Sequence, residues 1–242
     1  MRKEWLAVTE NIRIARDVWR MRLMGNTGEL TAPGQFVNVR TGGYYLRRPI
    51  SVCDWNENEI TLIYKVVGGG TQWLSERKSG DTLDVLTGLG NGFSVDACGN
   101  HPVLVGGGVG VPPLYGLARR LRAKQIPVTV VCGFASAADV FYRDEFAALG
   151  CTVKIATIDG TYGVCGTVVG LLDGNYTYSC ACGPIPMLRA VYDRLTCPGA
   201  YSFEERMGCG FGACMGCTCK TKYGAVRICR DGPVLEREAI VW

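Results

Sequence analysis

The sequence predicts a β + α/β protein built from three consecutive regions: an antiparallel β-barrel over residues 1–99, a parallel-sheet α/β domain over 100–200, and a small tail over 201–242. Three observations lead to this prediction. Short stretches of alternating apolar and polar residues fill the first region. Apolar runs alternate with helical patterns in the second. The third is rich in glycine and cysteine and too short to bury a core of its own.

The first region contains four stretches that alternate as half-buried strands do, with Gly, Pro, Asn and Asp between them. They cover residues 7–9, 18–23, 35–39 and 59–65. Strands this short and evenly spaced are typical of a small antiparallel barrel.

The second region alternates strand and helix. Apolar runs predict strands at 102–105, 128–132, 152–156 and 176–181. Helical spacing predicts helices over 114–124 and 140–149 and the start of another over 168–172, and Leu114, Leu117, Ala118 and Leu121 share one face. This order predicts a doubly wound parallel sheet.

Composition excludes several classes of function. The net charge is only +4, with basic residues scattered, so there is no nucleic-acid footprint. The N-terminus leads into no long apolar run, and no stretch of about 18 apolar residues exists, so we expect a soluble, cytoplasmic protein without a signal peptide. The single histidine, His101, precedes a proline and is interpreted as structural. Histidine-based catalysis or metal binding is thereby excluded, and cofactors must carry the chemistry.

Thirteen cysteines are unusual for such a chain. Cytosolic thiols stay reduced, so clustered cysteines indicate metal or cluster ligation rather than disulfides. The five that stand apart are interpreted as small buried hydrophobic residues: Cys53, Cys98, Cys132, Cys151 and Cys165.

The clustered cysteines of the tail give the strongest signal. Cys209, Cys214 and Cys217 are spaced C-x4-C-x2-C, with Cys229 further on. This is the plant-type [2Fe–2S] pattern, and its intervening glycines let the backbone bend closely around the sulfurs. A four-cysteine zinc site is the alternative, but structural zinc usually uses paired C-x2-C units. Cys219 fits the spacing worse and is left out of the ligand set.

Two features of the barrel suit a phosphate group. The segment Arg47-Arg48-Pro49-Ile50-Ser51 offers an arginine fork, and residues 64–71 lead from a strand through Gly68–Gly70 into a predicted helix. A solvated surface turn and a flexible hairpin are the respective alternatives. Together the two features predict a bound dinucleotide.

A third glycine loop, residues 106–113 (GGGVGVPP), follows a predicted strand and precedes a helix, as a nucleotide loop must. Cys182-Gly183-Pro184 follows a later strand and is expected at the same sheet edge, within reach of a nicotinamide. The alternative for Cys182 is a buried thiol before a turn. No acidic residue ends the strand at residues 131–135, so the usual ribose-binding carboxylate is missing. Residues 133–139 offer no arginine for a 2′-phosphate, which predicts NAD rather than NADP.

Six motifs in order make the chain similar to a known family. They are LRRPIS at 46–51, GGGVGVPPLY at 106–115, GFAS at 133–136, DGTYG at 159–163, ERMGC at 205–209 and CRDGPV at 229–234. Together they resemble the electron-transfer subunits of class 1B dihydroorotate dehydrogenases, within the ferredoxin-NADP reductase superfamily.

The resemblance implies an FAD on the barrel, a [2Fe–2S] cluster in the tail and NAD as co-substrate. It assigns FAD contacts to Arg48, Pro49, Ile50, Ser51, Ile63, Tyr64, Lys65, Gly70 and Thr71. It places NAD at Gly107, Gly108, Val109, Gly110, Cys182, Gly183 and Pro184. The superfamily often has tyrosine where Ile50 stands.

The resemblance also implies a relay in pyrimidine biosynthesis. A separate FMN-containing subunit would oxidise dihydroorotate, and electrons would pass through the cluster and FAD to NAD⁺ in a heterotetramer of two of each chain. The alternatives are a reductase subunit of a hydrogenase or transhydrogenase, and a zinc-stabilised binding module without redox function.

The cluster loop carries apolar residues with no obvious core to enter: Phe211, Ala213 and Met215. Exposed apolar residues beside a cofactor usually mark an interface, so we expect this loop to dock against the FMN subunit. Packing on the chain's own flavin domain is the alternative.

Overall fold

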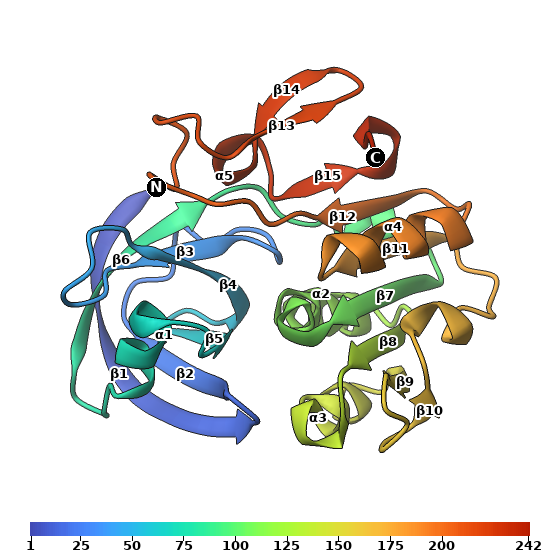
Figure 1. Cartoon of the computed structure of the whole chain (residues 1–242), viewed down its shortest axis with the longest axis horizontal. Helices are drawn as coiled ribbons and strands as arrows, with labels where there is room; N and C mark the ends of the chain where they lie inside the picture. The colour runs from blue at the N-terminus through green and yellow to red at the C-terminus, as the bar shows by residue number, and fades with distance from the viewer.

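The first region of the computed structural model, which describes residues 1–242, is a closed barrel of six antiparallel strands in the order β1-β2-β5-β4-β3-β6 (Figure 1). The strands are β1 (Arg2–Ala15), β2 (Val18–Met24), β3 (Phe36–Val39), β4 (Arg48–Trp55), β5 (Glu59–Lys65) and β6 (Thr82–Leu89). The predicted barrel is confirmed. A short helix, α1 (Gly69–Ser75), connects β5 to β6.

Alternation along the strands divides the barrel residues between two environments. Val37 and Val39 of β3 belong to the apolar interior of the barrel, together with Leu6, Leu23 and Leu62. Because neighbouring strand residues face opposite ways, Phe36 and Asn38 face outward. Phe36 indeed packs in a different apolar cluster, shared with the tail and the sheet.

The second region forms a seven-stranded sheet in the order β10-β9-β8-β7-β11-β12-β15. Its strands are β7 (Pro102–Gly107), β8 (Thr129–Phe134), β9 (Thr152–Thr157), β10 (Val164–Cys165), β11 (Tyr178–Cys182), β12 (Gly199–Ser202) and β15 (Val234–Glu236). All neighbours pair in parallel except β12 and β15. The tail thus contributes the antiparallel edge strand of this sheet.

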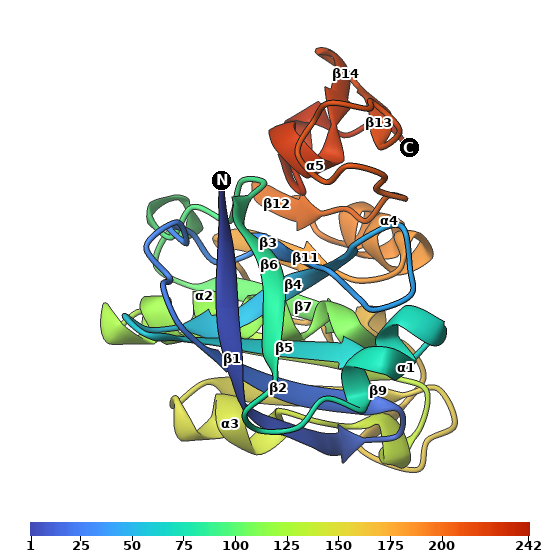
Figure 2. The same ribbon diagram turned by 90° about the vertical axis from the view of Figure 1, so that its left-hand side faces the viewer.

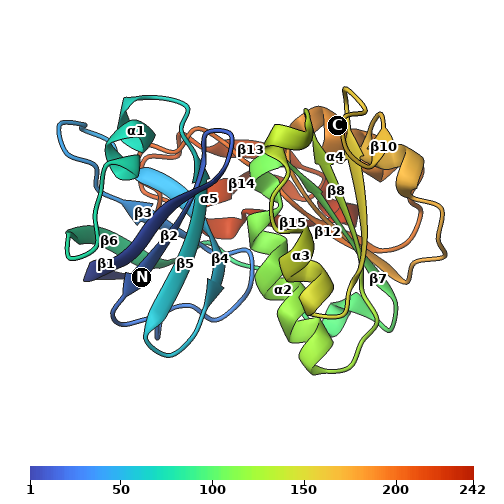
Figure 3. The ribbon, with the colours of Figure 1, turned by 90° about the horizontal axis from the view of Figure 1, so that it is seen from below.

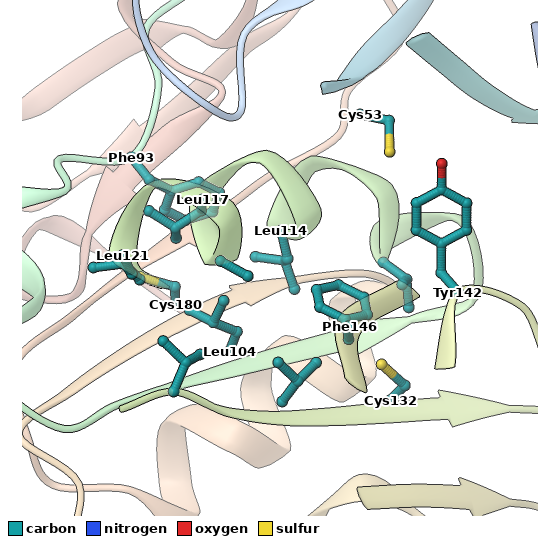
Figure 4. Packing of buried hydrophobic residues seen from close by; sticks show 14 of the residues in the cluster. Cys53, Phe93, Leu104, Leu114, Leu117, Leu121, Cys132, Tyr142, Phe146 and Cys180 are labelled. Carbon is teal, nitrogen blue, oxygen red and sulfur yellow. The ribbon is translucent and has the colours of Figure 1, made fainter. Parts of the chain in front are cut away.

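Helices cover both faces of the sheet, which confirms the predicted parallel-sheet domain. Helices α2 (Pro112–Ala123) and α3 (Arg143–Ala148) lie on one face, where Leu104 of β7 packs against Leu114, Leu117 and Leu121 of α2 (Figure 4). Helix α4 (Ile185–Arg194) and the 3₁₀ helix η4 (Val168–Leu171) cover the other face, which carries Val103 and Val105. Alternate β7 residues therefore serve two cores.

Two expected helices are shorter than their sequence pattern. The helix expected over 140–149 is α3, which begins only at Arg143 because Tyr142 has a left-handed backbone (φ 64°). Residues 168–171 form one 3₁₀ turn that ends at Leu171. The remaining 3₁₀ helices are η1 (Asp96–Cys98), η2 (Gly108–Gly110), η3 (Ala137–Asp139) and η5 (Arg237–Ala239).

Helix α2 joins the barrel to the sheet. Arg119 of α2 donates to the Asp54 carboxylate of β4 at 2.8 Å. A Cβ on Gly116 would lie 2.8 Å from the Cys53 carbonyl oxygen, so only glycine permits this approach. The Tyr142 hydroxyl is directed toward Cys53 across the same junction (Figure 4). Barrel and sheet share one apolar core here.

The tail lies across the seam between barrel and sheet (Figures 1–3). It contains a hairpin of β13 (Thr218–Thr221) and β14 (Gly224–Arg227), the helical turn α5 (Ile228–Asp231) and β15. Cys217, Ile228 and Cys229 are buried with Phe36 of the barrel and Val105 of the sheet. The tail is therefore stabilised by packing on both other regions.

All thirteen cysteines are free thiols. Cys53, Cys98 and Cys132 are buried, as expected, and Cys151 is half-buried. The expectation for Cys165 is wrong: it lies exposed on β10, the edge strand, where no helix covers it. None of the helices combines the length and apolar character needed to span a bilayer.

Candidate functional site

The cluster loop, residues 207–217, folds around the sulfur of Cys209. Three backbone N–H groups point at this Sγ, from Ala213 at 3.2 Å, Cys214 at 3.4 Å and Phe211 at 3.5 Å. Gly212 has a φ of +93°, and a Cβ there would lie 2.8 Å from Arg230 Cδ. The loop can converge on the sulfur because glycine adopts this conformation and leaves this space.

These hydrogen bonds stabilise a thiolate. Burial raises the pKa of the Cys209 thiol. The N–H groups of Cys214, Phe211 and Ala213 lower this pKa by more than burial raises it, so that it falls to about 6. Burial and the neighbouring Cys217 raise the pKa of Cys229 to about 12. Holding Cys229 as a thiolate beside Cys217 therefore needs a positive partner, which a ligated iron would supply.

The four predicted ligands fall into two pairs. The Cys209 N–H donates to Cys214 Sγ, and the Cys229 N–H donates to Cys217 Sγ, both at 3.4 Å. No three metal-ligating side chains gather closely enough to share one ion. Two pairs of thiols suit the two irons of a [2Fe–2S] cluster, each of which takes two cysteines, better than one tetrahedral zinc. Cys219 lies on the β13 hairpin, paired with Val226.

One side of the cluster loop faces solvent. Phe211 and Met215 are 44% and 59% exposed, and Ala213 and Cys214 are exposed as well. Cys217 and Cys229 are buried beneath them. This exposure favours the expected docking surface over packing of these apolar side chains on the flavin domain.

On the barrel, Arg48 and the start of α1 lie against each other. The Arg48 guanidinium lies over the Tyr44 ring, 5.1 Å from its centroid, and donates to the Leu46 carbonyl oxygen, but it takes part in no ion pair. A Cβ on Gly70 would meet Arg48 Nε at 2.3 Å, so the guanidinium sits directly against the first turn of α1. An unpaired cation beside the positive end of a helix is favourable only when an anion neutralises both, and a pyrophosphate meets this need.

The neighbouring arginine has a different role. Arg47 Nη2 donates to the buried Asp84 carboxylate at 2.8 Å, and Nη1 donates to the Asp84 and Asn38 carbonyl oxygens. These contacts tie β3, β4 and β6 together. The two arginines therefore form no fork.

The other residues expected at FAD differ in exposure. Arg48, Pro49, Ile50 and Ser51 are all half-buried along β4. Ile63 is buried beside α2, and Tyr64 is buried in the barrel, where its hydroxyl donates to Asn11. Burial raises the pKa of Tyr64. Lys65 is exposed, and the Thr71 hydroxyl accepts the Val67 and Gly68 N–H groups. Because both hydroxyls are already engaged, Tyr64 and Thr71 can contact a ligand through their backbone but not through their side-chain hydroxyls.

The two nucleotide-loop segments lie together, as the parallel pairing of β7 with β11 requires. A Cβ on Gly110 would lie 2.2 Å from the Cys182 carbonyl oxygen, and one on Gly107 would lie 3.0 Å from Pro184. Gly108 and Gly183 are half-buried, whereas Val109 and Pro184 are exposed. Burial raises the pKa of the Cys182 thiol to about 12, so this group is neutral at physiological pH.

Sequence reasoning missed an arginine at the end of β8. Arg16, from the turn between β1 and β2, donates to the Ser136 hydroxyl at 2.7 Å and forms a bidentate ion pair with Asp139. This hydrogen-bonded guanidinium lowers the pKa of Asp139 in spite of burial. The partners are more than a hundred residues apart in sequence, so no local pattern could have signalled them.

A cleft of about 560 Å³ joins the three regions. Residues 46–49 of the barrel, 183–185 after β11 and 204–207 before the cluster loop line it. Its edge at Met207 is two residues from Cys209. A planar ligand bound here would contact the arginine segment, the Gly183-Pro184 turn and the approach to the cluster cysteines.

Comparison with known proteins gives a consistent result. Residues 204–241 match the family model described as the iron-sulfur cluster binding domain of dihydroorotate dehydrogenase B. The chain is 43% identical over 255 residues to the dihydroorotate dehydrogenase B (NAD(+)) electron transfer subunit of Bacillus pumilus strain SAFR-032, covering 99% of this chain and 98% of the relative. The corresponding subunit of Fusobacterium nucleatum is 41% identical over 251 residues, covering 97% and 96%.

Among solved structures, the chain is similar to one of an NADH-dependent reduced ferredoxin-NADP oxidoreductase, described for flavin-based electron bifurcation. The TM-score is 0.88 at 28% identity, with 98% of this chain and 90% of the other covered. The arrangement of barrel, parallel sheet and tail is therefore shared with a flavin-dependent reductase.

Proposed function

The chain belongs to the family of dihydroorotate dehydrogenase B (NAD⁺) electron-transfer subunits, and on that premise we propose that it passes electrons from an FMN-containing subunit, which oxidises dihydroorotate, to NAD⁺. A bound [2Fe–2S] cluster would supply one-electron transfer, and bound FAD would exchange single electrons for the hydride that NAD⁺ accepts. The residues of this chain bind and orient these groups. The free thiols suit the reducing cytoplasm, where we place the protein.

The observation that carries the proposal is the cleft shared by the three regions. Its walls are the arginine segment of the barrel, the Gly183-Pro184 turn and Met207, which leads into Cys209. Electron transfer needs short gaps between cofactors, and only a common cleft brings all three binding segments together. A zinc-stabilised binding module would have no use for this arrangement.

Each binding segment in or beside the cleft has a physical role in the proposal. Arg48 and the first turn of α1 would neutralise the FAD pyrophosphate, while the half-buried Pro49 to Ser51 segment would line the ring system. Gly107, Gly108 and Gly110 leave room for the NAD backbone at the carboxyl edge of the sheet. Cys182 would meet the nicotinamide as a neutral thiol.

The exposed side of the cluster loop is the proposed docking surface for the FMN subunit. Phe211, Ala213 and Met215 are exposed around Cys214, and apolar residues beside a cofactor commonly form interfaces. We propose a heterotetramer of two of each chain.

Coupled turnover tests the function. The purified chain, loaded with FAD and cluster, is mixed with its FMN-containing partner and given dihydroorotate and NAD⁺. We expect reduction of NAD⁺ only when both chains and dihydroorotate are present. An intact FAD- and cluster-loaded chain that never couples dihydroorotate to NAD⁺ would contradict the proposal.

The solved reductase with a TM-score of 0.88 favours one second candidate, a subunit that exchanges electrons between NADH and a ferredoxin. The same purified chain distinguishes the two functions. Rapid ferredoxin reduction by NADH without any partner, combined with no coupling to dihydroorotate, would favour the ferredoxin reductase.

A further inference from the structure

One strand of the barrel supports both the cleft and the cluster loop. In the β3–β4 pair, Phe36 lies opposite Ser51 and Asn38 lies opposite Pro49. Ser51 and Pro49 belong to the proposed FAD segment. The outward-facing Phe36 packs with Cys217 and Cys229. A single inter-strand spacing, about 5 Å, therefore separates Pro49, which lines the cleft, from Asn38, whose side chain contacts Cys209.

Asn38 makes the corresponding polar contact on the Cys209 side. Its Nδ2 donates to the Cys209 carbonyl oxygen at 3.3 Å, and its side chain is almost completely buried. A Cβ on Gly210 would lie 2.3 Å from this Nδ2, and Gly210 has a φ of +79°. The glycine next to the ligand therefore provides the space that the Asn38 amide occupies.

The other half of the amide has no partner. Asn38 Oδ1 is buried and makes no hydrogen bond. An unpaired buried carbonyl destabilises the fold, and leucine has the same branching and the same number of side-chain heavy atoms as asparagine without this cost. Barrel stability alone therefore favours an apolar residue at position 38. Compared with such a residue, asparagine adds only the hydrogen bond to Cys209.

We propose that Asn38 is a positioning residue that fixes the Cys209 side of the [2Fe–2S] cluster relative to the cleft and tunes the cluster potential. Its N–H dipole points its positive end toward Cys209, which favours the reduced, more negative cluster. Arg47 holds the Asn38 backbone in place by donating to its main-chain carbonyl oxygen. The inference rests on the proposed cluster but not on the identity of the partner subunit.

The test is Asn38→Leu in the full chain loaded with FAD and cluster, with Asn91→Leu as the matched control. Asn91 also ties the tail to the barrel, but at Val234, through hydrogen bonds of 2.7 and 2.9 Å. For Asn38→Leu we expect a lower cluster midpoint potential, an altered electron paramagnetic resonance line shape, and iron release to a chelator about fivefold faster, the equivalent of one hydrogen bond. Its thermal unfolding should change little.

The control should show the opposite pattern: a lower unfolding temperature with an unchanged potential and line shape. Equal shifts of the potential in both variants would mean that general anchoring of the tail is responsible, and unchanged potential and iron release in Asn38→Leu would overturn the proposal. Asn38→Thr, which suits a strand but cannot reach Cys209, gives the same comparison if leucine prevents folding. Absence of iron from the unaltered chain would instead refute the cluster on which the inference rests.

Discussion

Replacing Asp139 with asparagine should relax the preference for NAD over NADP. Arg16 lies at the carboxyl end of β8, the position from which this type of sheet reads the adenosine ribose, but its charge is neutralised by Asp139. The substitution would keep the shape of the side chain and remove its negative charge. The Arg16 guanidinium and the Ser136 hydroxyl would then be available to a 2′-phosphate.

The structure limits the size of this effect. The Arg16 side chain is half exposed, so solvent screens its attraction for a phosphate. The binding free energy gained for NADPH should therefore equal that of a weak charge-assisted hydrogen bond. We expect kcat/KM for NADPH to rise about tenfold, with that for NADH changing by about twofold or less. The assay is steady-state reduction of an artificial electron acceptor by the isolated, FAD-loaded chain, which needs no partner subunit.

A double variant provides the control. Arg16→Gln combined with Asp139→Asn should lose the gain for NADPH, since the gain depends on the released guanidinium. An unchanged ratio of the two kcat/KM values in Asp139→Asn, or a preference for NADPH in the unaltered chain, would refute the reasoning.

Three further predictions concern the cofactors and the partner. Cys214→Ser should remove most of the iron and acid-labile sulfide while Cys219→Ser should not; equal losses would contradict the ligand assignment. Arg48→Ala should weaken FAD retention about tenfold, measured by titration of the apoprotein, because it removes a charge-assisted contact. Arg47→Met should instead lower the unfolding temperature, because it removes the ion pair with Asp84. Unchanged FAD affinity in Arg48→Ala would refute the role of Arg48. Met215→Glu should leave FAD and cluster intact but abolish co-elution with the FMN subunit and dihydroorotate-dependent NAD⁺ reduction, and survival of both would place the interface elsewhere.

The arrangement of strands and helices was predictable because it follows local periodicity. Alternation over 59–65 corresponds to β5 residue for residue, and the apolar run at 102–105 is the core of β7. The helix expected over 140–149 was less accurate because Tyr142 has a left-handed backbone at the barrel–sheet junction, where its hydroxyl is directed toward Cys53. Tertiary contacts of this kind leave no periodic trace in the sequence.

The candidate site was predictable only where its residues are close in sequence. Cys209 and Cys214 lie on one loop, so their spacing predicts that they approach each other, as they do. Cys217 pairs instead with Cys229, which is twelve residues further along the chain. The adjacent Arg47 and Arg48 form no fork, since each has a different tertiary partner. Arg16 was missed because its approach to Asp139 depends on how the barrel docks on the sheet.

The tail shows why these three regions must be considered together. Its short hairpin has no core, and its buried Ile228 packs with Phe36 of the barrel and Val105 of the sheet. Strand β15 then joins the sheet beside β12, which begins at Gly199, before the predicted boundary at 200. Since the same contacts that stabilise the tail also fix the cysteines relative to the cleft, the spacing between cluster and cleft is set by the core of the protein. Electron transfer across a constant distance between cofactors needs no conformational change in such a chain. Core substitutions that make this packing less tight should change the rate of electron transfer even where the protein stays folded.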